Sequence, residues 1–255
     1  MREHLPPHGP QRAGATSEAA TRATTSEVRR IARVYEGYGA AEVQARWSLD
    51  NPGNRAILQE RTRVISRMLL DAGWRTLAGK RILDVGCGSG GELARMTRFG
   101  ARAADLHGVD LLTERVAEAR RRYRHIRFDA ADATDLRGLV PSQSVDVVLA
   151  MTLFSSLLDD EVAGRVAAEM TRVLKPGGAV LYYDMRVANR ANENVRPYSR
   201  GKLAELFPGF ERSFKRVTLA PPLARRLGGT TRWAYPLLAT LPPLRTHYVG
   251  WLRRK

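Results

Sequence analysis

The sequence predicts an α/β protein with a mostly parallel sheet of seven strands, helices on both faces of the sheet, a helical cap at the N-terminus and an insertion before the last strand. Five short apolar runs between residues 82 and 185 alternate with helical patterns, as in parallel strands joined by helical crossovers. The first run ends in a glycine-rich turn, residues 86–91. Two later runs, near 210–219 and 246–254, complete the seven strands and enclose a proline-rich, basic insertion at about 220–245.

Length and composition limit the kind of protein. At 255 residues the chain is long enough for one domain with an appendage. Its one cysteine excludes an internal disulfide framework and indicates a reducing compartment. The sequence has no apolar run of about 18 residues and no apolar stretch typical of a signal peptide near its start. We therefore expect a cytoplasmic protein without a transmembrane helix.

The net charge of +16 is concentrated near the C-terminus. Residues 186–255 hold 15 lysine and arginine residues against three acids, which gives this segment a charge of +12. A hydrated surface without a binding role explains this excess of positive charge as well as a binding function does. The functional interpretations are an anionic acceptor, a nucleic acid or an acidic membrane surface.

The N-terminal part of the chain predicts a tail followed by a cap. Residues 1–26 are rich in Pro, Gly, Ala, Thr and Ser and predict a disordered tail. Helical periodicity over Glu27 to Trp47, and again from Ile57 to Ala72, predicts a cap above the strand ends, residues 27–73. Three aromatic residues of this cap either close over a cofactor or pack in the core; they are Tyr35, Tyr38 and Trp47. The main domain then covers residues 74–255.

The stretch from Ile82 to Glu92 has the pattern of a buried strand, a tight glycine turn and the start of a helix. Such a turn brings backbone N–H groups close to a ligand. Its glycines fit the dinucleotide fingerprint G-x-G-x-x-G, but Asp84 lies two residues before the first of them. A pyrophosphate gains nothing from that carboxylate, whereas the amino-acid part of S-adenosylmethionine (SAM) carries an ammonium group. The turn by itself leaves a nicotinamide cofactor and SAM both open.

Acidic residues also follow the next two strands. Asp110 ends the run that begins at Leu106, and a carboxylate at this distance from the glycine turn can accept hydrogen bonds from both hydroxyls of a ribose. Leu111 follows it and can pack on an adenine face. Asp132, after the third strand, can accept from an adenine amino group, and the backbone of Ala133 can address the ring.

Residues 82–91 and the run LKPGG at 174–178 resemble motifs of the class I SAM-dependent methyltransferases, and together with the acids at 110 and 132 they occur in that family's order. The resemblance implies a Rossmann-like fold with SAM as the cofactor. The residues it assigns to cofactor binding are Asp84, Gly86, Gly88, Gly90, Asp110, Leu111, Asp132, Ala133 and Ala150. Residues 152–157 and 183–200 resemble a bacterial subgroup associated with glycan and natural-product modification.

Ligands in this fold lie beyond the carboxyl ends of the strands, so residues 152–157 and 183–200 are expected to line the acceptor pocket. Asp184, at the end of the fifth strand, is the candidate general base. The candidates for holding the acceptor, above all an anionic one, are Tyr183, Arg186, Arg196 and Tyr198. The insertion forms either a wall of this pocket or a patch that touches a membrane. No metal-ligand spacing is visible, so no metal is expected.

The sequence therefore predicts an enzyme that moves a methyl group from SAM to a small molecule, with a hydroxyl of a sugar, glycan or secondary metabolite as the expected acceptor. An RNA methyltransferase that uses the basic C-terminal region is one alternative, although no RNA-binding module is visible and nucleic acid is the less favoured partner. A NAD-type oxidoreductase is a second, although no Tyr-x-x-x-Lys constellation is evident. A binder that keeps the cofactor pocket without catalysis is a third. The oligomeric state is not predicted.

Overall fold

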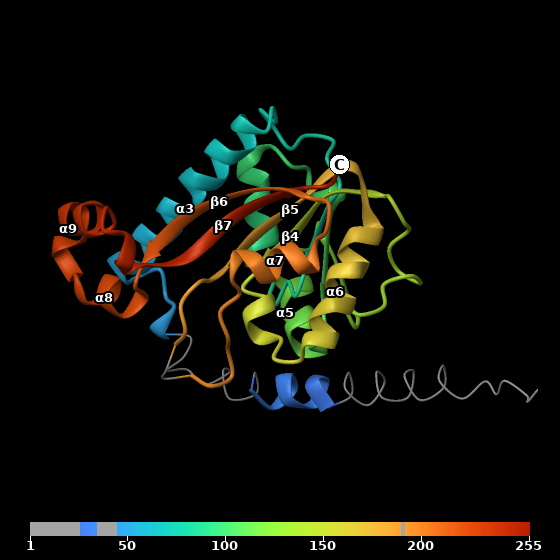
Figure 1. Cartoon of the computed structure of the whole chain (residues 1–255), viewed down its shortest axis with the longest axis horizontal. Helices are drawn as coiled ribbons and strands as arrows, with labels where there is room; N and C mark the ends of the chain where they lie inside the picture. Colours follow the sequence, from blue (N-terminus) through green and yellow to red (C-terminus); the bar gives the residue numbers. More distant parts are fainter. Residues whose placement is uncertain (1–25, 35–44, 190–191) are drawn as a thin grey trace, which may run out of the picture.

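The computed structural model describes residues 26–34, 45–189 and 192–255. Its centre is a seven-stranded sheet in the order β3-β2-β1-β4-β5-β7-β6 (Figure 1). β7 runs antiparallel to both of its neighbours, and the pairs from β3 across to β5 are parallel. The strands are β1 (Ile82–Val85), β2 (Leu106–Asp110), β3 (Arg127–Ala130), β4 (Val145–Met151), β5 (Leu174–Met185), β6 (Glu211–Leu219) and β7 (Arg245–Arg253). The predicted fold class is confirmed.

Helices cover both faces of the sheet. Neighbouring residues of a strand point to opposite faces, so their side chains enter two separate cores. In β5, Leu181 and Tyr183 belong to the core under one set of helices, whereas Val180 and Tyr182 belong to the other. The first set is α3 (Pro52–Asp71), α4 (Gly91–Arg95) and α5 (Thr113–Arg122). The second is α6 (Asp160–Val173) and α7 (Arg200–Leu206). Short 3-10 turns are η1 (Met96–Phe99), η2 (Ala103–Asp105), η3 (Phe154–Ser156), η4 (Gly228–Thr230) and η5 (Pro242–Leu244).

Helix α6 shows how local sequence sets these elements. Asp159 caps its N-terminus by accepting from the backbone N–H groups of residues 161 and 162. Its apolar residues recur at intervals of three and four, so they form one stripe that is buried against the sheet. The buried residues of that stripe include Val162, Val166, Met170 and Val173.

The predicted N-terminal cap divides into two parts with different positions. Residues 26–34 form a helix near the carboxyl ends of the strands, at the bottom of Figure 1. Helix α3 instead lies along one face of the sheet, where Ile65, Met68 and Leu69 are buried. Trp47 is 56% exposed, and the Arg225 guanidinium stacks 5.0 Å from its ring centroid. Trp47 is therefore neither a core residue nor a cover for the pocket described below.

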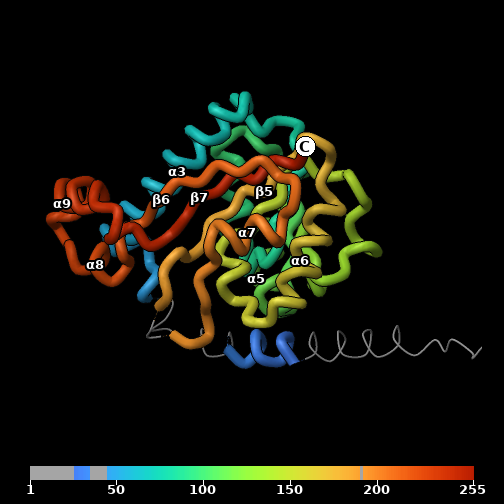
Figure 2. The backbone as a smooth tube through the Cα atoms, viewed as in Figure 1, coloured from blue at the N-terminus to red at the C-terminus, as the bar shows by residue number. Residues whose placement is uncertain are grey.

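The insertion between β6 and β7 consists of α8 (Pro221–Arg226), η4, α9 (Thr231–Leu238) and η5. It packs on the N-terminal half of α3 around a small core of its own, with Ile57, Leu219, Ala224, Tyr235 and Ala239 buried. The backbone trace shows α8 and α9 at the end of the molecule away from α6 (Figure 2). No residue of 220–245 lines the pocket described below. That the insertion walls an acceptor site stays a prediction.

Two expectations about the N-terminal region lie outside the described residues: the disordered tail up to residue 25, and the positions of Tyr35 and Tyr38. The proposed boundaries at 26 and 73 stay predictions. Within the ranges that the structure describes, no helix combines the length and the apolar character needed to cross a bilayer.

Candidate functional site

A pocket opens where the strand order reverses, between β1 and β4, at the carboxyl ends of the strands. This is the position at which open parallel sheets bind ligands. Its polar side follows β1, β2 and β3, and its other side follows β4. Residues from the N-terminal helix, including Val28 and Ile31, complete the lining.

The glycine turn after β1 lets the backbone form one wall of this pocket. Gly86 and Gly90 have φ angles of 73° and 80°, in the left-handed region that favours glycine. A Cβ atom on Gly90 would lie 2.6 Å from Cζ of Phe128. Gly90 also precedes the first residue of α4, so the N-terminus of this helix begins at the pocket wall. Backbone of this kind is open to a ligand and presents N–H groups to it.

Asp84 lies at the base of the pocket, and in the described ranges of the chain neither of its buried carboxylate oxygens has a hydrogen-bond partner. Its side chain is 1% exposed. Burial raises the pKa of this carboxyl well above its ordinary value, and the charges of Glu92 and Asp110 raise it further. A buried carboxylate without a partner is costly, so this site is suited to a cation that the protein chain does not itself supply.

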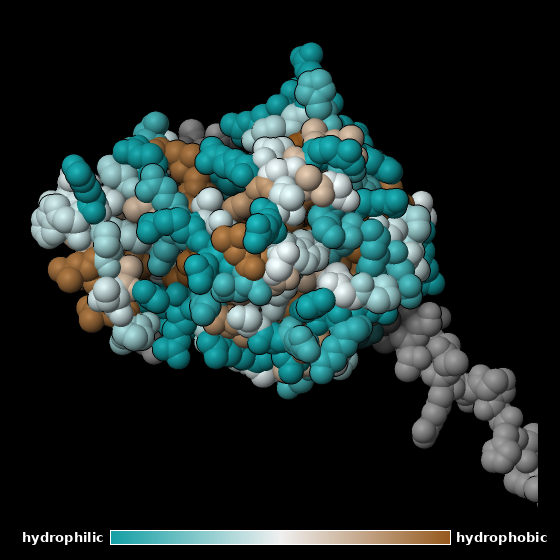
Figure 3. Space-filling model, turned by 90° about the horizontal axis from the view of Figure 1, so that it is seen from above, coloured by the Kyte–Doolittle hydropathy of each residue, from teal (hydrophilic) through white to brown (hydrophobic). Residues whose placement is uncertain are grey.

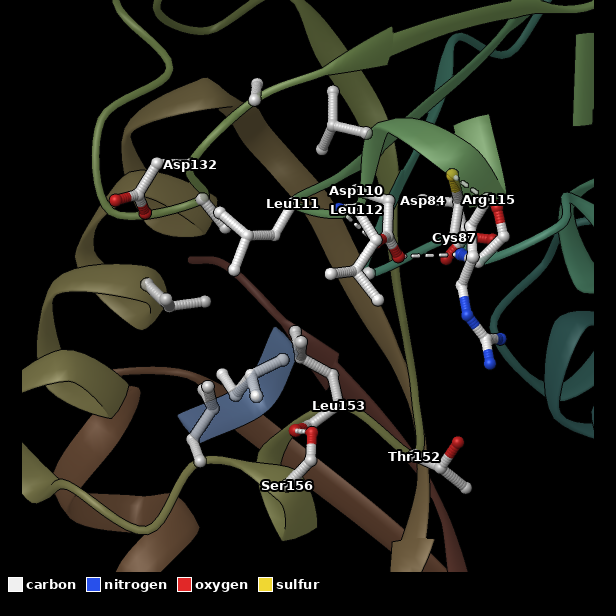
Figure 4. Close-up of a pocket in the computed structure, with 18 of the residues that line it drawn as sticks. Asp84, Cys87, Asp110, Leu111, Leu112, Arg115, Asp132, Thr152, Leu153 and Ser156 are labelled. Carbon is white, nitrogen blue, oxygen red and sulfur yellow. Dashed lines mark hydrogen bonds between the residues drawn. The ribbon is translucent and has the colours of Figure 1, made fainter. Parts of the chain in front are cut away.

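The carboxylate of Asp110 is fixed at the end of β2. Its Oδ2 accepts from the Gly88 N–H at 2.8 Å and its Oδ1 from the Leu112 N–H at 2.9 Å. Asp132 lies across the pocket, where its Oδ1 accepts from the Thr134 N–H at 2.8 Å (Figure 4). Both carboxylates keep lone pairs for a ligand, because each can accept several hydrogen bonds. The three acids thus come from three successive strands and border one pocket.

The N-terminal helix is held on the pocket by a pair of buried charges. Glu27 accepts from Arg30 and from the backbone N–H of Leu158, the latter at 2.7 Å. Arg30 also donates to the carbonyl of Ser156. Burial acts to raise the pKa of Glu27, but the hydrogen bonds from Arg30 and Leu158 and the Arg30 charge outweigh it and leave the pKa lowered. The helix is therefore tied to the loop after β4, which forms the opposite wall.

That opposite wall begins at Thr152, directly after β4. Thr152 has a φ of 57°, an uncommon value for a threonine, and its N–H donates to the Tyr183 carbonyl at 2.6 Å. Strained backbone of this kind is concentrated at functional sites. The rest of this wall is apolar and faces the acids. It consists of Leu153, Leu157, Val162 and Val166, together with Val28 and Ile31 of the N-terminal helix.

Comparison with known proteins agrees with this geometry. Residues 82–178 match the family model described as a methyltransferase domain. A phthiotriol/phenolphthiotriol dimycocerosates methyltransferase of Mycobacterium leprae is 33% identical over 132 residues, which are 51% of this chain and 47% of the relative. A fatty-acid O-methyltransferase of Mycolicibacterium smegmatis is 36% identical over 110 residues, 42% of this chain and 38% of the relative. The chain spans less than half the length of these curated relatives.

Over residues 82–178, these matches support the resemblance to the class I SAM-dependent methyltransferases. A solved geranyl diphosphate C-methyltransferase from Streptomyces coelicolor, crystallised with S-adenosyl-L-homocysteine, shares the fold with a TM-score of 0.54 at 16% identity and covers 76% of each chain. At this identity the likeness supports the fold alone.

Eight of the nine residues assigned to cofactor binding surround the pocket. Seven of them line it directly: Asp84, Gly86, Gly88, Asp110, Leu111, Asp132 and Ala133. Gly90 supports the turn from behind. Ala150 does not line it, because it is fully buried in the core under α6, and the pocket is reached one residue later, from Met151. Neighbouring side chains of a strand point to opposite faces, so the Ala150 side chain points away from the pocket, and its assignment to the cofactor stays a prediction.

Asp184 does not face the pocket, so the structure contradicts its prediction as the general base. Its side chain has no exposure. Its Oδ2 accepts from the Ser155 N–H at 2.9 Å and its Oδ1 from its neighbour, the Met185 N–H, at 2.8 Å. Burial raises its pKa to about 6, although these hydrogen bonds act to lower it. Asp184 thereby anchors the turn after β4 from inside the protein.

The four residues predicted to hold the acceptor are also absent from the pocket lining. The Tyr183 hydroxyl is 2.9 Å from that of Thr218, and its ring stacks on His247. Arg186 donates to the carbonyl of Arg245 at 2.6 Å. Arg196 donates to the Leu157 carbonyl at 2.9 Å and to Asp160 and Tyr198, while Tyr198 is 1% exposed. These side chains hold other parts of the chain together, and segment 183–200 does not line this pocket.

Several pocket residues were not predicted from the sequence, among them Glu27, Ile31, Cys87, Glu92 and Arg115. Cys87 and Glu92 lie next to the predicted glycines in the sequence, and this proximity could have identified them as pocket residues. No sequence pattern indicated the position of the N-terminal helix, because its periodicity predicts a buried face but not the residues that cover it. Among the described residues, no group of three or more His, Cys, Asp or Glu side chains is arranged to hold a metal ion; the expectation that no metal takes part stays a prediction.

Proposed function

We propose that this protein binds SAM and transfers its methyl group to a small molecule with a large apolar part. The observation that carries the first half is Asp84, whose buried oxygens have no hydrogen-bond partner among the residues that the structure describes. A cation at the glycine turn satisfies them, and the ammonium group of an amino acid is such a cation. The same position disfavours a dinucleotide, because its pyrophosphate would face the Asp84 carboxylate at the turn.

The other residues of the pocket fit the remaining parts of SAM. The backbone from Gly86 to Gly88 and the N-terminus of α4 suit the carboxylate of the amino acid. Asp110 suits the ribose hydroxyls, since its position is fixed by two backbone N–H groups. Asp132 and the backbone of Ala133 suit the adenine ring, with Leu111 and Leu112 beside it. A sulfonium methyl group is already electrophilic, so this cofactor supplies the reactive carbon when it is bound.

The protein's own part in the reaction is positioning. An acceptor atom held in line with the departing sulfur gains effective concentration, which can supply about 7–11 kcal/mol of the barrier. Glu27 and Glu92, which line the pocket, are each engaged by an arginine. The arrangement of these residues therefore favours orientation and exclusion of water over a dedicated proton acceptor.

An apolar acceptor suits the pocket better than a free sugar does. The wall opposite the acids consists of aliphatic side chains from the loop after β4, from α6 and from the N-terminal helix. A sugar ring would leave its hydroxyl groups without partners against that wall. Two relatives support the same class by name, one a methyltransferase of phthiotriol dimycocerosates and the other of fatty acids. We propose a hydroxyl or carboxyl oxygen at the end of such a molecule as the methylated atom.

Two measurements test this function. Calorimetry with SAM and with NADH is expected to show binding of SAM alone; binding of NADH without SAM would reverse the cofactor assignment. Transfer of labelled methyl groups is then measured into fatty acids, phenolic lipids, glycans and RNA. Labelling of glycans or RNA in preference to lipids would overturn the acceptor class. SAM binding with no transfer to any acceptor would favour a non-catalytic binder, since a fold does not by itself fix the reaction.

We retain the cytoplasm as the proposed compartment. The support is that Cys87, the one cysteine of the chain, is a free, buried thiol beside the pocket. Burial raises its pKa strongly, as do the charges of Asp84 and Asp110, so the thiol stays protonated. Localisation of a tagged full-length chain in the native host would test the compartment directly.

A further inference from the structure

The outer face of the insertion is apolar where a surface helix is normally polar. One side of α9 is buried against the small core and includes Ala234 and Tyr235. The other side exposes Trp233 and Leu237, both 65% exposed, and Leu241 follows after one more turn at 49% exposed. Residues four apart on a helix share one face. At the left end of Figure 3, where α8 and α9 lie, hydrophobic surface gathers at the tip of the molecule.

Only basic charges accompany this apolar surface along the chain. Residues 212–255 contain no aspartate or glutamate. Arg232 is exposed on α9 directly before Trp233, and Arg226 is exposed at the end of the preceding helix, α8. Exposed Lys215 and Arg216 lie on β6, the strand that leads into the insertion. An exposed apolar face bordered by cations, with no anion nearby in sequence, is complementary to an anionic lipid surface.

We propose that this surface, defined by Trp233, Leu237 and Leu241 with Arg226 and Arg232, docks the protein on an anionic lipid bilayer. The inference deepens the proposed function and rests on it in one respect, since an acceptor with a long apolar part resides in a bilayer. The docking itself requires neither SAM nor methyl transfer. Tryptophan and leucine at one face enter the boundary between headgroups and acyl chains, while the arginines remain at the headgroups.

The insertion is joined to the pocket through two neighbouring residues of α3. Glu60 accepts from the Tyr235 hydroxyl of α9 at 2.7 Å and from the Thr218 N–H of β6 at 2.8 Å. Arg61 donates to Glu92, which lines the pocket, at 2.5 Å. These contacts fix the docking face relative to the pocket. A protein resting on a bilayer through α9 therefore holds its pocket in a defined position relative to the lipid.

Two other occupants fit this surface less well. Nucleic acid is bound through cations and stacked aromatic rings, whereas this face offers leucines and prolines beside one tryptophan. A second copy of the chain would bring its own arginines against Arg226 and Arg232, with no acid in residues 212–255 to offset them. An anionic bilayer satisfies both the apolar residues and the cations.

The test measures co-sedimentation of the full chain with vesicles of phosphatidylcholine, with and without phosphatidylglycerol. Binding is expected with the anionic vesicles, to weaken as salt is raised, and to shift the tryptophan emission to the blue. Replacing Trp233→Ser together with Leu237→Ser should weaken binding at least about tenfold. Replacing Arg226→Gln together with Arg232→Gln should weaken it by about fivefold per arginine, hence roughly 25-fold for the pair. These side chains are exposed, so the fold is expected to persist, which circular dichroism checks.

Matched controls change the same chemistry elsewhere. Leu70→Ser removes an exposed leucine from the far end of α3, and Arg121→Gln with Arg124→Gln removes two exposed cations near α5. Controls that bind vesicles as wild type, beside weakened α9 variants, support the proposal. Equal binding of neutral and anionic vesicles, equal loss in controls and α9 variants, a dimer that dissociates in the Trp233/Leu237 variant, or RNA binding without vesicle binding would each overturn it. SAM calorimetry on the same samples separates this outcome from failure of the proposed function.

Discussion

Two groups of polar side chains, one near β1 to β3 and the other near β5, differ in their hydrogen-bond partners. The carboxylates of Asp84 in β1, Asp110 at the end of β2 and Asp132 after β3 border an open pocket. Asp84 has no hydrogen-bond partner among the described residues. Asp184, near the end of β5, and Arg196, beyond it, are bonded to backbone and side chains of the protein itself. Both groups lie at or just beyond the carboxyl ends of strands, and the sequence predicts that both face ligands.

The difference shows that a charged residue after a strand marks a ligand site only if the protein leaves its hydrogen-bonding capacity unused. Buried polar groups are almost always paired inside a protein. At Asp84 both oxygens lack a partner among the described residues and the side chain borders a pocket, which together indicate a ligand. Asp184 and Arg196, which are paired, indicate structural anchors. Four predictions follow from this contrast, ordered by the size of the effect.

The largest effect is expected at Asp84. Asp84→Asn removes the charge that would meet the ammonium group of SAM, and breaking one side of a buried ion pair reduces affinity by on the order of 1000-fold. The ligand-free protein should be at least as stable as wild type, because a buried carboxyl without a partner is removed. Calorimetry gives the affinity and thermal unfolding gives the stability.

Glu118→Gln on α5 is the control for charge alone, since that side chain is exposed. Unchanged SAM affinity in Asp84→Asn would remove this residue from the cofactor site and erase the contrast. Because the pKa of Asp84 is raised in the ligand-free protein, SAM affinity of the wild type should also rise with pH until the carboxyl is ionised.

The second effect concerns the pH dependence of stability at Asp184. Its pKa is raised from 3.8 to about 6 in the folded protein, so the stability from its protonated form is present below the unfolded value and is lost as pH rises through about 6. The change amounts to about 3 kcal/mol. Relative to wild type, Asp184→Asn should therefore gain about this much free energy of unfolding between pH 4 and pH 7, measured by urea unfolding.

The same variant distinguishes an anchor from a base. If Asp184 took a proton from the acceptor, kcat would fall steeply and its pH profile would lose a limb. As an anchor of the turn after β4, the variant should keep the shape of the pH profile. A difference in stability that does not change with pH would contradict the raised pKa of Asp184, whereas a steep fall in kcat with loss of a limb of its pH profile would place Asp184 with the ligand-facing carboxylates.

The third effect concerns Glu27, whose contacts hold the N-terminal helix on the pocket. Glu27→Gln weakens the tie between the N-terminal helix and the backbone at Leu158, so SAM affinity should fall about fivefold, equivalent to about 1 kcal/mol. The pKa of Glu27 is lowered in the folded protein, so its contribution is present above its ordinary value and is lost as pH falls through the lowered one. Arg33→Gln, an exposed residue of the same helix, should leave SAM affinity unchanged. Equal affinity in both variants would show that the helix is not a functional part of the pocket wall.

The smallest effect is expected at Arg196. Arg196→Gln loses the bond to the Leu157 carbonyl and one to Asp160, and should lower the free energy of unfolding by about 1 kcal/mol. The KM for the acceptor should change less than about twofold, since this side chain lies outside the pocket lining. Lys202→Gln, which reaches Asp160 but not Leu157, is the control. A large rise in KM with unchanged stability would return Arg196 to the acceptor site.

The order of strands and helices was accessible from the sequence because it depends on local patterns. The run Leu106–Asp110 coincides with β2 as predicted, and the glycine turn followed from a strand that breaks into glycine before a helix. Asp84 was identified for the same reason, since its distance from the turn is set by covalent connection. The side chain that β4 contributes to the pocket was not accessible in this way, because alternation along the strand places Met151, and not Ala150, in the lining.

The acceptor side was decided only by tertiary structure. The sequence places Asp184 at a strand end and Arg196 in a loop. It does not show that the backbone N–H of Ser155 donates to Asp184, or that Arg196 donates to the carbonyl of Leu157. In the same way, the helical pattern of residues 27–34 gave no sign that Glu27 would reach Leu158. Polar groups that the sequence suggests for ligand binding can instead form hydrogen bonds with residues far away in the chain. These pairs form only when the fold of the sheet brings the partners together.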